Sequence, residues 1–537
     1  MLEASRSQIV RVIPVLIAAC LFVFPAHAKY SGGTGKPNDP YRIATPADLI
    51  ALGETPADYG KHFILTTDID LDPNLPGGRV FDRAVIAPAT SVDYYGNSTG
   101  TSFVGVFDGG GHTVSHLKIM GGSYLGLFGQ LGSKAIVINL GLQAGEVNGT
   151  GDYVGSLAGR NEGGSIAVSY STGSVTGAGD YIAGLVGGNK GTIASSYSNA
   201  SVGGSLCVGG LAGGNGGSIT TSYSSGSVNG SLYVGGLVGG NGGSITTSYS
   251  NVSVGGSVCV GGLVGDNGGS ITTSYSSGSV SGSGHVGGLV GSGSPAAVIR
   301  CIWDMEICGQ SVSSGGVGLS TAEIMDPYML GLTGFANNPN WVLDAGFDYP
   351  RLAWEGTPGG MIPEPDIDWL EGQGTAEAPY GIATADQLIL VGKASILCDR
   401  HFVLGADIDL DPNLPGRLVF EQAVIPAFFG VFDGNGHTIS HLRITGGSYL
   451  GFLGHLGSNA TVINLCLQAV EVNGTGDYVG SLVGDNRGSI ATSYSTAAVS
   501  GNRSVGGLVG ASYVGASITA SYCGSTVDGH SSVGGLV

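Results

Sequence analysis

Three aspartates alternate with apolar residues early in the sequence, and the pattern returns later. Asp68, Asp70 and Asp72 form the first acidic set, and the second set consists of Asp407, Asp409 and Asp411. On a β-strand, alternate side chains lie on one face about 6.5–7 Å apart, so the carboxylates of a set repel each other. A Ca²⁺ ion with oxygen ligands would relieve that repulsion, although the glycine and the glutamate of an EF-hand loop are missing here. We therefore expect either a calcium site or a solvated acidic strand edge.

Two histidines follow an aspartate at four-residue intervals in each copy of another motif. The first copy contains Asp108, His112 and His116, and the second contains Asp433, His437 and His441. Aspartate and neutral imidazole both bind metal ions. A four-residue step brings side chains together on a helix but separates them by roughly 13 Å along a strand. We therefore expect a structural role at a corner of the fold, with metal binding as the alternative.

Tyrosines recur at a regular interval through the middle of the chain. This tyrosine column consists of Tyr170, Tyr197, Tyr223, Tyr249 and Tyr275, and Tyr494 and Tyr522 hold the same place in a later segment. Rings that point outward would form a platform on which sugar rings can stack, whereas rings that point inward would fill the core. Strand alternation does not decide between the two directions, because a bend between Ile219 and Tyr223 would change the outcome.

The elements that hold these side chains are predicted to be short strands of a repeated coil. Leucines recur mostly every 26 residues, at Leu157, Leu185, Leu211, Leu237, Leu263 and Leu289. A fixed period of this length indicates a solenoid. Short runs of Val, Ile, Thr, Ser and Tyr between Gly-Gly or Gly-Asn-Gly are typical of strands joined by tight turns. Asparagines at the same interval predict a ladder of hydrogen-bonded amides, formed by Asn161, Asn189, Asn215, Asn241 and Asn267.

The composition fits such a coil. The chain of 537 residues has 101 glycines and 42% apolar residues, and 11% of its residues are charged. The Gly-X-Y period of collagen is missing, and the regularly spaced apolar residues argue against disorder. In stacked coils, glycine allows close approach of backbones and left-handed turn positions. We therefore predict an all-β fold, a parallel β-helix.

A larger duplication predicts two tandem β-helix units. DIDLDPNLPG at 68–77 returns at 407–416, and FDGGGHTVSHLKI at 107–119 returns as FDGNGHTISHLRI at 432–444. We expect a signal peptide at 1–28, capping and irregular coils at 29–145, 26-residue repeats at 146–295, a cap and linker at 296–360, capping and irregular coils of the second unit at 361–470, and its repeats at 471–537. The last repeat stops inside VGGLV, so we expect the second unit to lack a cap or part of a coil.

Short helices are expected to cover the open ends of these units. Thr45 and Thr384 are each followed, three residues later, by an acid or an amide, which is the capping-box pattern of a helix start. This pattern predicts helices at 46–53 and 385–393. A third capping box begins at Ser320.

The repeats resemble the GLUG-motif family, which is named for Gly-Leu-x-Gly and occurs in large exported bacterial proteins. The motif stands at 184–187, 210–213, 236–239, 262–265, 288–291 and 507–510, while Ser156 and Ser481 replace the first glycine elsewhere. The FDGNGHTI segments are similar to coils of right-handed β-helix proteins of the pectate-lyase-like group. The resemblance implies that the two tandem units are right-handed parallel β-helices of a surface protein or adhesin, and such a fold does not fix an activity.

Residues 1–28 have the pattern of an export signal, with a basic start, an apolar stretch and Ala26-His27-Ala28 as the cleavage site. A lipobox ending at Cys20 is the alternative and would leave a lipid-anchored cysteine. No later segment has the 18 or more apolar residues of a transmembrane helix. We therefore expect a secreted or cell-surface protein, cleaved near Ala28. Its net charge of −19 argues against binding nucleic acid or anionic membranes.

Cys207 and Cys259 hold the same place in repeats that lie two coils apart. At strand spacing, their Cα atoms would be about 9–10 Å apart, which is too far for a disulfide. We expect both to be small apolar fillers. Cys301 and Cys308 could close a short loop.

We expect a monomeric exported scaffold that binds polysaccharide or another surface macromolecule through many weak, repeated contacts. No cofactor other than calcium is expected. The alternatives are a polysaccharide-cleaving enzyme, either a lyase or a glycosidase, and a structural stalk for a further domain. A convergent pair of carboxylates in a groove would indicate the enzyme, and an outward tyrosine column without such a pair would indicate the binder.

Overall fold

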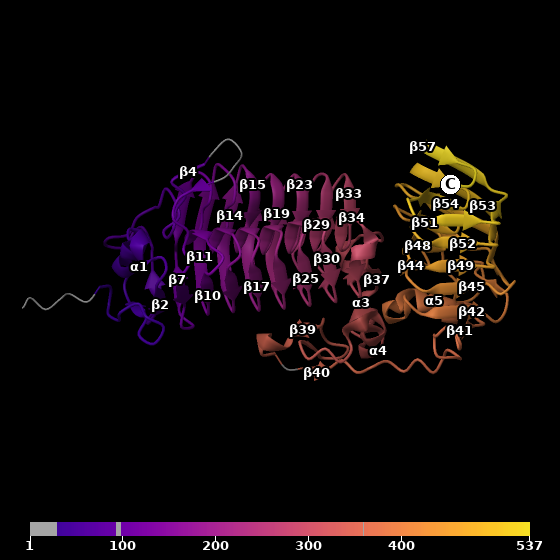
Figure 1. Cartoon of the computed structure of the whole chain (residues 1–537), viewed down its shortest axis with the longest axis horizontal. Helices are drawn as coiled ribbons and strands as arrows, with labels where there is room; N and C mark the ends of the chain where they lie inside the picture. Colours follow the sequence, from indigo (N-terminus) through magenta and orange to yellow (C-terminus); the bar gives the residue numbers. More distant parts are fainter. Residues whose placement is uncertain (1–28, 93–97, 358) are drawn as a thin grey trace, which may run out of the picture.

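The chain folds into stacked coils of short parallel strands (Figure 1). The computed structural model describes residues 29–92, 98–357 and 359–537, so the predicted signal peptide and Cys20 lie outside the described residues. Strands account for 46% of the structure and helices for 9%, and the strands form a parallel β-solenoid of about 16 turns. The predicted all-β fold is confirmed.

The strands between residues 41 and 319, named the first stack, form four parallel sheets. The first sheet contains β1 (Tyr41–Ile43), β2 (His62–Leu65), β6 (Val106–Asp108), β10 (Ile136–Ile138), β13 (Ser165–Ala167), β17 (Thr192–Ala194), β21 (Ser218–Thr220), β25 (Ser244–Thr246), β30 (Ser270–Thr272) and β35 (Val298–Ile299). The second contains β3 (Ile69–Asp70), β7 (Thr113–Ser115), β8 (Lys118–Gly121), β11 (Gly141–Gly149), β14 (Tyr170–Gly177), β18 (Tyr197–Gly203), β22 (Tyr223–Asn229), β26 (Tyr249–Ser250), β27 (Ser253–Gly255), β31 (Tyr275–Ser276), β32 (Val280–Ser281), β36 (Ile302–Asp304) and β37 (Val317–Leu319).

The third sheet contains β9 (Phe128–Leu131), β12 (Ala158–Asn161), β16 (Val186–Asn189), β20 (Ala212–Asn215), β24 (Val238–Asn241), β29 (Val264–Asn267) and β34 (Val290–Gly293). The fourth contains β15 (Asp180–Ala183), β19 (Leu206–Gly209), β23 (Leu232–Gly235), β28 (Cys259–Gly261) and β33 (His285–Gly287). The strands β4 (Ser91–Val92) and β5 (Ser98–Thr99) form an antiparallel pair beside the stack.

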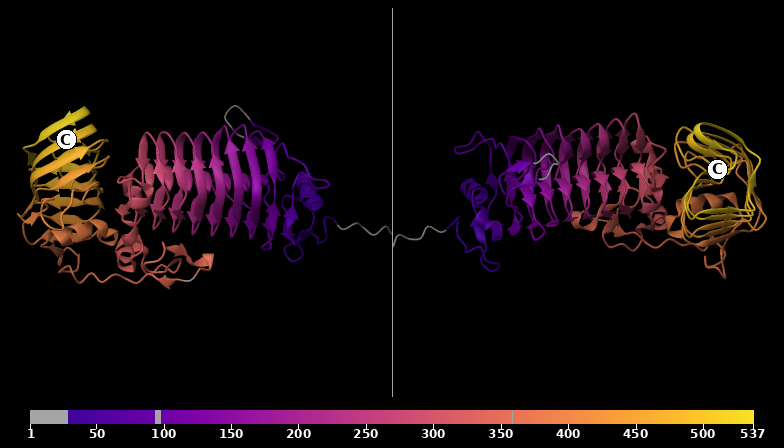
Figure 2. Two further views of the ribbon diagram at one scale, coloured as in Figure 1. Left: turned by 180° about the vertical axis from the view of Figure 1, so that it is seen from behind. Right: turned by 45° about the horizontal axis from the view of Figure 1, so that its top comes forward.

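The strands between residues 380 and 534, named the second stack, form three further parallel sheets. One sheet contains β41 (Tyr380–Ile382), β42 (His401–Leu404), β45 (Val431–Asp433), β49 (Thr461–Ile463), β52 (Ser489–Ala491) and β55 (Ser517–Thr519). Another contains β43 (Ile408–Asp409), β46 (Thr438–Ser440), β47 (Arg443–Gly446), β50 (Cys466–Gly474), β53 (Tyr494–Gly506), β56 (Tyr522–Cys523) and β57 (Thr526–Gly534). The last contains β44 (Ile425–Phe428), β48 (Leu453–Leu456), β51 (Val483–Asn486) and β54 (Val509–Ser512). Figure 2 shows the second stack beside the end of the first.

One repeat shows how the sequence makes a coil. Strands β21, β22, β23 and β24 follow each other, and the next strand, β25, lies beside β21 with Ile245 paired to Ile219. The leucines of the 26-residue interval are all fully buried, from Leu157 to Leu289. Burying such a side chain completely contributes about 1.5–3 kcal/mol relative to leaving it exposed. A single coil would leave these side chains open at both faces, so the stack is the unit that folds.

The two glycines of Gly-Leu-x-Gly are required by close contacts between backbones. A Cβ added to Gly236 would lie 2.2 Å from the carbonyl oxygen of Gly262, and one added to Gly239 would lie 2.5 Å from the carbonyl carbon of Cys207. Left-handed positions were expected to be glycines too, but several in the repeats carry side chains instead, such as Tyr181 with φ 63°. The glycines therefore serve mainly the close approach of neighbouring coils.

The predicted asparagine ladder is present and buried. The side-chain amide nitrogen of Asn189 donates to Oδ1 of Asn215 at 2.9 Å, and that of Asn215 donates to Oδ1 of Asn241 at 2.8 Å. The ladder starts at Asn161 with a bond of 2.9 Å and ends at Asn267 with one of 2.7 Å. These bonds satisfy polar groups that would otherwise be buried without a partner.

The helices are short. They are α1 (Pro46–Gly53), α2 (Met305–Cys308), α3 (Thr321–Ile324), α4 (Pro327–Leu330) and α5 (Ala385–Lys393), with single turns at η1 (Pro56–Asp58), η2 (Pro295–Ala297), η3 (Gly331–Phe335), η4 (Ala353–Glu355) and η5 (Ser395–Leu397). As predicted, α1, α3 and α5 follow capping boxes at Thr45, Ser320 and Thr384. Leu49 and Leu52 of α1 are fully buried in the core of the first stack, so this helix covers apolar surface.

Residues 331–355, named the covering segment, lie along the outside of the first stack. The segment contains η3, β38 (Trp341–Leu343), β39 (Arg351–Leu352) and η4, and β38 also pairs with β40 (Gly360–Met361). Figure 1 shows β39 and β40 beneath the strands of the first stack. Residues 296–360, which were expected to form one terminal cap and a linker, therefore form two different parts of the structure. Strand β37 continues the stack beside β36, whereas the covering segment turns back along it.

All seven cysteines among the described residues are free thiols. Cys301 and Cys308 are therefore not joined. Cys207 and Cys259 are 8% and 7% exposed, in agreement with the prediction that both are buried fillers.

Candidate functional site

The tyrosine column points out of the first stack. Its ring centroids are 4.9 Å apart from Tyr170 through Tyr249 and 5.1 Å apart between Tyr249 and Tyr275, with neighbouring planes within 7° of parallel. The residue after each tyrosine points the other way. Ser224, for example, is fully buried, and its Oγ donates to the carbonyl oxygen of Gly236 across the coil. The direction that the sequence left open is therefore outward.

The covering segment packs over the later part of the column. Tyr249 and Tyr275 are 5% and 1% exposed. The ring of Trp341 lies over both tyrosines, at centroid distances of 6.2 and 5.6 Å. The three earlier tyrosines of the column keep partly exposed side chains. The column is thus divided into a covered end and an open end.

Trp354 marks the boundary between the two ends. Its indole lies 6.3 Å from the ring of Tyr197 and 5.8 Å from that of Tyr223, with the planes inclined by 29° and 26°. The indole Nε1 donates to the carbonyl oxygen of Thr221 at 2.8 Å. This bond fixes the indole against the stack, so its orientation is set before any ligand arrives.

A groove of about 490 Å³ runs from Trp354 along the open rings. Tyr170 and Tyr197 form its aromatic floor with Trp354, and the other lining residues are Gly110, Gly111, Asn139, Leu140, Gly141, Val168, Ser169 and Ser195. Its size and its mostly apolar, aromatic lining with a few polar groups are typical of small-ligand sites. The groove is built from residues of the first stack and from one residue of the covering segment.

Glu355 binds the covering segment to the column. Its Oε2 accepts a hydrogen bond from the hydroxyl of Tyr249 at 3.0 Å, and its Oε1 accepts one from the backbone of Leu352 at 2.7 Å. Burial raises the pKa of the Glu355 carboxyl above its usual range, and these hydrogen bonds only partly oppose that effect. The hydroxyl of Tyr275 donates to the carbonyl oxygen of Pro350 at 2.6 Å and ties the segment at a second point.

The structure brings the two acidic motifs of the sequence together. Strand β3 pairs with β7, which places His112 Nδ1 3.3 Å from Asp68 Oδ1 and His116 Nδ1 2.8 Å from Asp70 Oδ1. The second stack repeats the arrangement, with His437 3.2 Å from Asp407 and His441 2.8 Å from Asp409. The hydrogen bond from His116 lowers the pKa of Asp70.

The third aspartate of each set has different partners. Asp72 Oδ1 accepts hydrogen bonds from the backbone and the side chain of Asn74, and Asp411 does the same with Asn413. Among the described residues, no group of three or more His, Cys, Asp or Glu side chains is placed to hold a metal ion. The calcium site at either acidic set stays a prediction.

Trp354 and Glu355 were not identified from the sequence. The only signal for them was the enrichment of Trp in residues 296–360, because neither belongs to a repeat.

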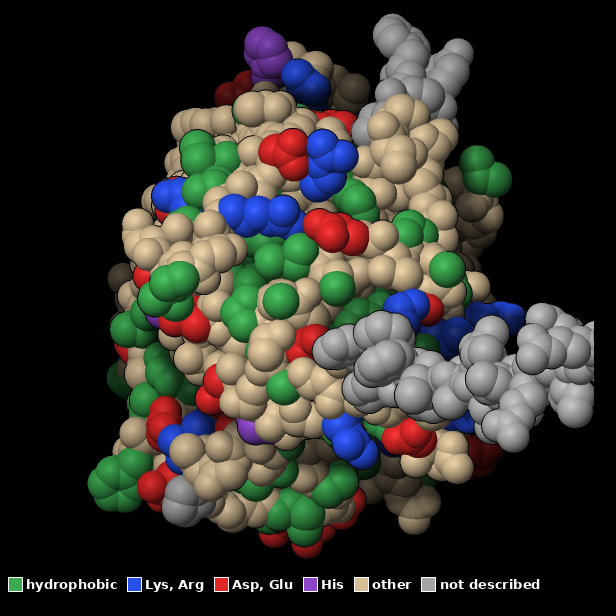
Figure 3. Space-filling model, turned by 90° about the vertical axis from the view of Figure 1, so that its left-hand side faces the viewer, with side chains coloured by type: hydrophobic (Ala, Val, Ile, Leu, Met, Phe, Trp, Pro, Cys, Tyr) green, Lys and Arg blue, Asp and Glu red, His purple; other side chains and the backbone are tan. Residues whose placement is uncertain are grey.

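The face at the N-terminal end of the first stack carries acidic and basic side chains interspersed with each other (Figure 3). Within the described ranges, no helix is long and apolar enough to cross a membrane.

Two proteins are similar to parts of this chain. Halomucin of Haloquadratum walsbyi is 35% identical over 148 residues, which cover 26% of this chain and 2% of halomucin. A candidate Gly-rich membrane protein of Evansella cellulosilytica is 39% identical over 128 residues, which cover 22% of this chain and 14% of that protein. The chain thus matches only a small part of each relative's length.

No protein-family model matches the chain. Among solved structures, a candidate immunoglobulin A1 protease from Bacteroides ovatus aligns with a TM-score of 0.39 and 22% identity, over 60% of this chain and 95% of that one.

Proposed function

We propose that the protein is a surface or extracellular scaffold that binds polysaccharide in the groove between the open tyrosines and Trp354. The observation that carries this proposal is the outward column of parallel rings, completed at one end by an indole that is already fixed by a hydrogen bond. Aromatic faces present large, rigid apolar area at little entropic cost, and the apolar faces of sugar rings pack against them.

The charge of the chain favours a glycan over a polyanion as the ligand. A net charge of −19 repels nucleic acid, whereas neutral sugars carry no charge to be repelled. Asn139 and Ser195 place polar groups in the groove, where sugar hydroxyls could bind. A long polysaccharide would also reach several molecules on one surface, so weak contacts would add up.

The surface location rests on the sequence and on the partial similarities. Residues 1–28 have the pattern of an export signal. Similarity to halomucin and to a candidate membrane protein supports a surface or extracellular location. The Gly-Leu-x-Gly repeats, through their resemblance to the GLUG-motif family, favour the same class of protein.

The proposal is tested by incubating the purified chain with plant, algal and bacterial polysaccharides, in Ca²⁺ or in EDTA. Each tube is read for bound protein and for released reducing or unsaturated ends. Binding without product supports the scaffold, and a need for Ca²⁺ would point to the acidic sets at Asp68 and Asp407. Product from any substrate would replace the scaffold with an enzyme. If there is no binding and no product, the structural stalk becomes the favoured function.

A further inference from the structure

A second column of side chains runs along the first stack where the third and fourth sheets meet. Its members hold equivalent places in successive coils and are Tyr124, Tyr153, Tyr181, Cys207, Tyr233, Cys259 and His285. The rings of Tyr153 and Tyr181 stack with centroids 4.9 Å apart and planes 7° from parallel. At the next coil, where a third ring would continue the stack, the chain has Cys207. The column therefore lacks one ring between Tyr181 and Tyr233.

The floor beneath the column shows the same gap. Gly188, Gly214 and Gly240 stand at paired positions of successive strands. A Cβ added to Gly188 would lie 2.9 Å from the ring of Tyr153, and one added to Gly214 would lie 2.7 Å from the ring of Tyr181. At Gly240 the nearest atom is the Sγ of Cys207, at 3.5 Å. The rings of Tyr153 and Tyr181 each cover a glycine of a following coil, but Gly240 has only a thiol above it.

Aromatic residues stand on both sides of this gap. The backbones of Tyr181, Cys207 and Tyr233 share a left-handed conformation, with φ of 63°, 54° and 55°, so their side chains leave the coil in the same direction. Two steps of the 4.9 Å ring spacing separate the levels of Tyr181 and Tyr233, which gives about 9.8 Å. A single ring placed midway would have an aromatic face about 4.9 Å away on each side, within the usual range of ring stacking.

A carboxylate lies at the edge of the gap. Asp266 pairs with Gly240 on the next coil and is half-buried. Its negative charge is the first cause of the raised pKa of Tyr233, which places it close to that ring. Among the described residues, no Lys, Arg or His nitrogen lies within 4.0 Å of its oxygens. Asp266 is thus free to accept hydrogen bonds from a ligand, and hydroxyl-to-carboxylate bonds are among the stronger ones.

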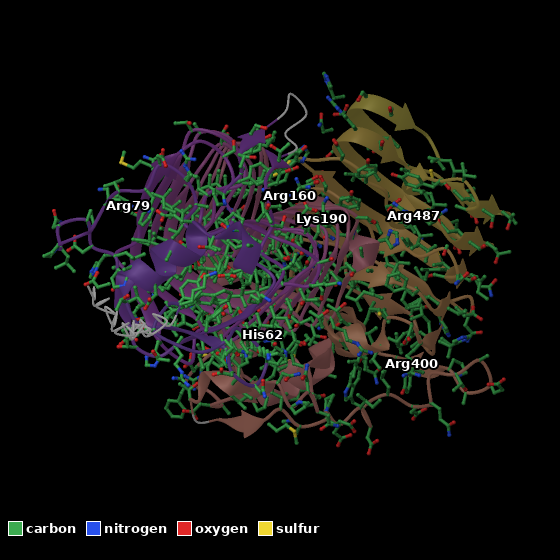
Figure 4. The ribbon with its side chains drawn as sticks, turned by 60° about the vertical axis from the view of Figure 1, so that its left-hand side comes forward. His62, Arg79, Arg160, Lys190, Arg400 and Arg487 are labelled. Carbon is green, nitrogen blue, oxygen red and sulfur yellow. The ribbon has the colours of Figure 1, made fainter. Side chains whose placement is uncertain are left out.

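Four of the residues named above, Tyr181, Cys207, Gly240 and Asp266, line one groove of about 420 Å³. Arg160 and Lys190 lie close together at its other end (Figure 4). Both form ion pairs with the single carboxylate of Glu162, which balances one of their two positive charges. At the gap itself, the charge beside Cys207 and Tyr233 is that of Asp266, which favours a neutral ligand rich in hydroxyl groups over an anionic one there.

We propose that the gap at Cys207 binds one neutral pyranose ring, which stacks between Tyr181 and Tyr233 and donates hydroxyl hydrogen bonds to Asp266. The site lies on the third and fourth sheets, whereas the tyrosine column begins the strands of the second. It therefore stands independently of the proposed polysaccharide groove. The sugar ring would occupy the place that a tyrosine ring fills in the coils on either side.

Saturation-transfer NMR on the full chain tests the site. The protein carries Trp354→Ala, which removes the indole of the other groove, and the probes are the methyl glycosides of glucose, galactose, mannose and N-acetylglucosamine, with methyl glucuronide as the anionic control. At least one neutral glycoside is expected to receive saturation and methyl glucuronide at least about tenfold less. Adding Cys207→Tyr should weaken that binding at least tenfold, because the new ring fills the gap. Adding Cys207→Ser should retain the binding, because the gap stays open.

The Cys207→Tyr variant is expected to fold, since tyrosine occupies the same left-handed position in neighbouring coils. Thermal unfolding checks this directly. The proposal is overturned if no neutral glycoside receives saturation in the Trp354→Ala background. It is also overturned if binding persists in the folded Cys207→Tyr protein. Because the Trp354→Ala background is used throughout, failure of the polysaccharide groove would not produce either result.

Discussion

The hydroxyl of Tyr249 donates a 3.0 Å hydrogen bond to Oε2 of Glu355, which joins a repeat of the solenoid to a segment 106 positions later in the chain. This contact holds the covering segment over the end of the tyrosine column. It thereby positions the neighbouring Trp354 beside the rings that remain open. The groove exists because the covering segment stops at that point.

Glu355→Gln is expected to stabilise the docked segment, and to do so more at high pH than at low pH. Burial raises the folded pKa of Glu355 above its usual 4.5, so the folded protein keeps a proton that the unfolded chain has released. The stability of the wild type therefore falls as the pH rises from the unfolded pKa through the folded pKa of Glu355. A neutral glutamine removes this fall. Thermal unfolding between about pH 4 and pH 8 measures the difference in Tm. A difference that shrinks as the pH rises would contradict the buried-carboxylate account.

Gly239→Ala is expected to lower the free energy of unfolding by about 1–3 kcal/mol, the usual cost of forcing an extra group into a packed interior. The new methyl group would lie 2.5 Å from the backbone of Cys207. Gly242→Ala is the matched control, because its nearest neighbour is the carbonyl oxygen of Asn215 at 3.9 Å. Urea unfolding of both variants makes the comparison, and equal losses would show that close approach does not explain the motif.

Asn215→Ala is expected to destabilise the first stack by about 1–3 kcal/mol for each group left without a partner. The substitution removes the acceptor of Asn189 and the donor to Asn241, and both side chains stay buried. Asn199→Ala changes an exposed asparagine of β18 and should alter stability by less than about 0.5 kcal/mol. Chemical unfolding measures the two losses. If the two variants unfold at the same urea concentration, the ladder contributes nothing specific.

Asp70→Asn combined with Asp409→Asn is expected to lower Tm slightly near neutral pH and to have no effect in strong acid. Hydrogen bonds from His116 and His441 lower the pKa of these two carboxyls. Their stabilisation is therefore present above the usual aspartate value of 3.8 and is lost as the pH falls through the lowered pKa. Both pairs are exposed, so each should contribute less than about 1 kcal/mol. The double variant Asp72→Asn with Asp411→Asn is the control. A loss of Tm that grows as the pH falls would contradict the prediction.

The features that could be predicted from the sequence are local or periodic. The helix after Thr45 follows from its capping box, whose partners lie within three residues. The ladder around Asn215 follows from a fixed interval, because equal places in stacked coils must meet. The contact between Asp70 and His116 could not be predicted from a local or periodic pattern, since it requires the register in which Ile69 pairs with Val114.

The candidate groove depended on a segment outside the repeats. The direction of Tyr197 was left open by the sequence, because a turn of unknown shape precedes it. Trp354 belongs to no repeat, and its distance along the chain from Thr221 gives no periodic signal. Long-range docking of an irregular segment is decided by side-chain packing that no local pattern encodes.

The central claim is that the open rings and Trp354 bind polysaccharide. The most direct measurement compares the equilibrium affinity of wild type, Trp354→Ala and Tyr522→Ala for the polysaccharide that retains the wild-type chain best. Tyr522 is a matched control, because it is 60% exposed and stacks on Tyr494 at 5.0 Å in the second stack, away from the groove. We predict a Kd at least about tenfold weaker for Trp354→Ala, which corresponds to about 1.4 kcal/mol, and an unchanged Kd for Tyr522→Ala. Equal binding by wild type and Trp354→Ala, or no retention on any polysaccharide, would contradict the claim.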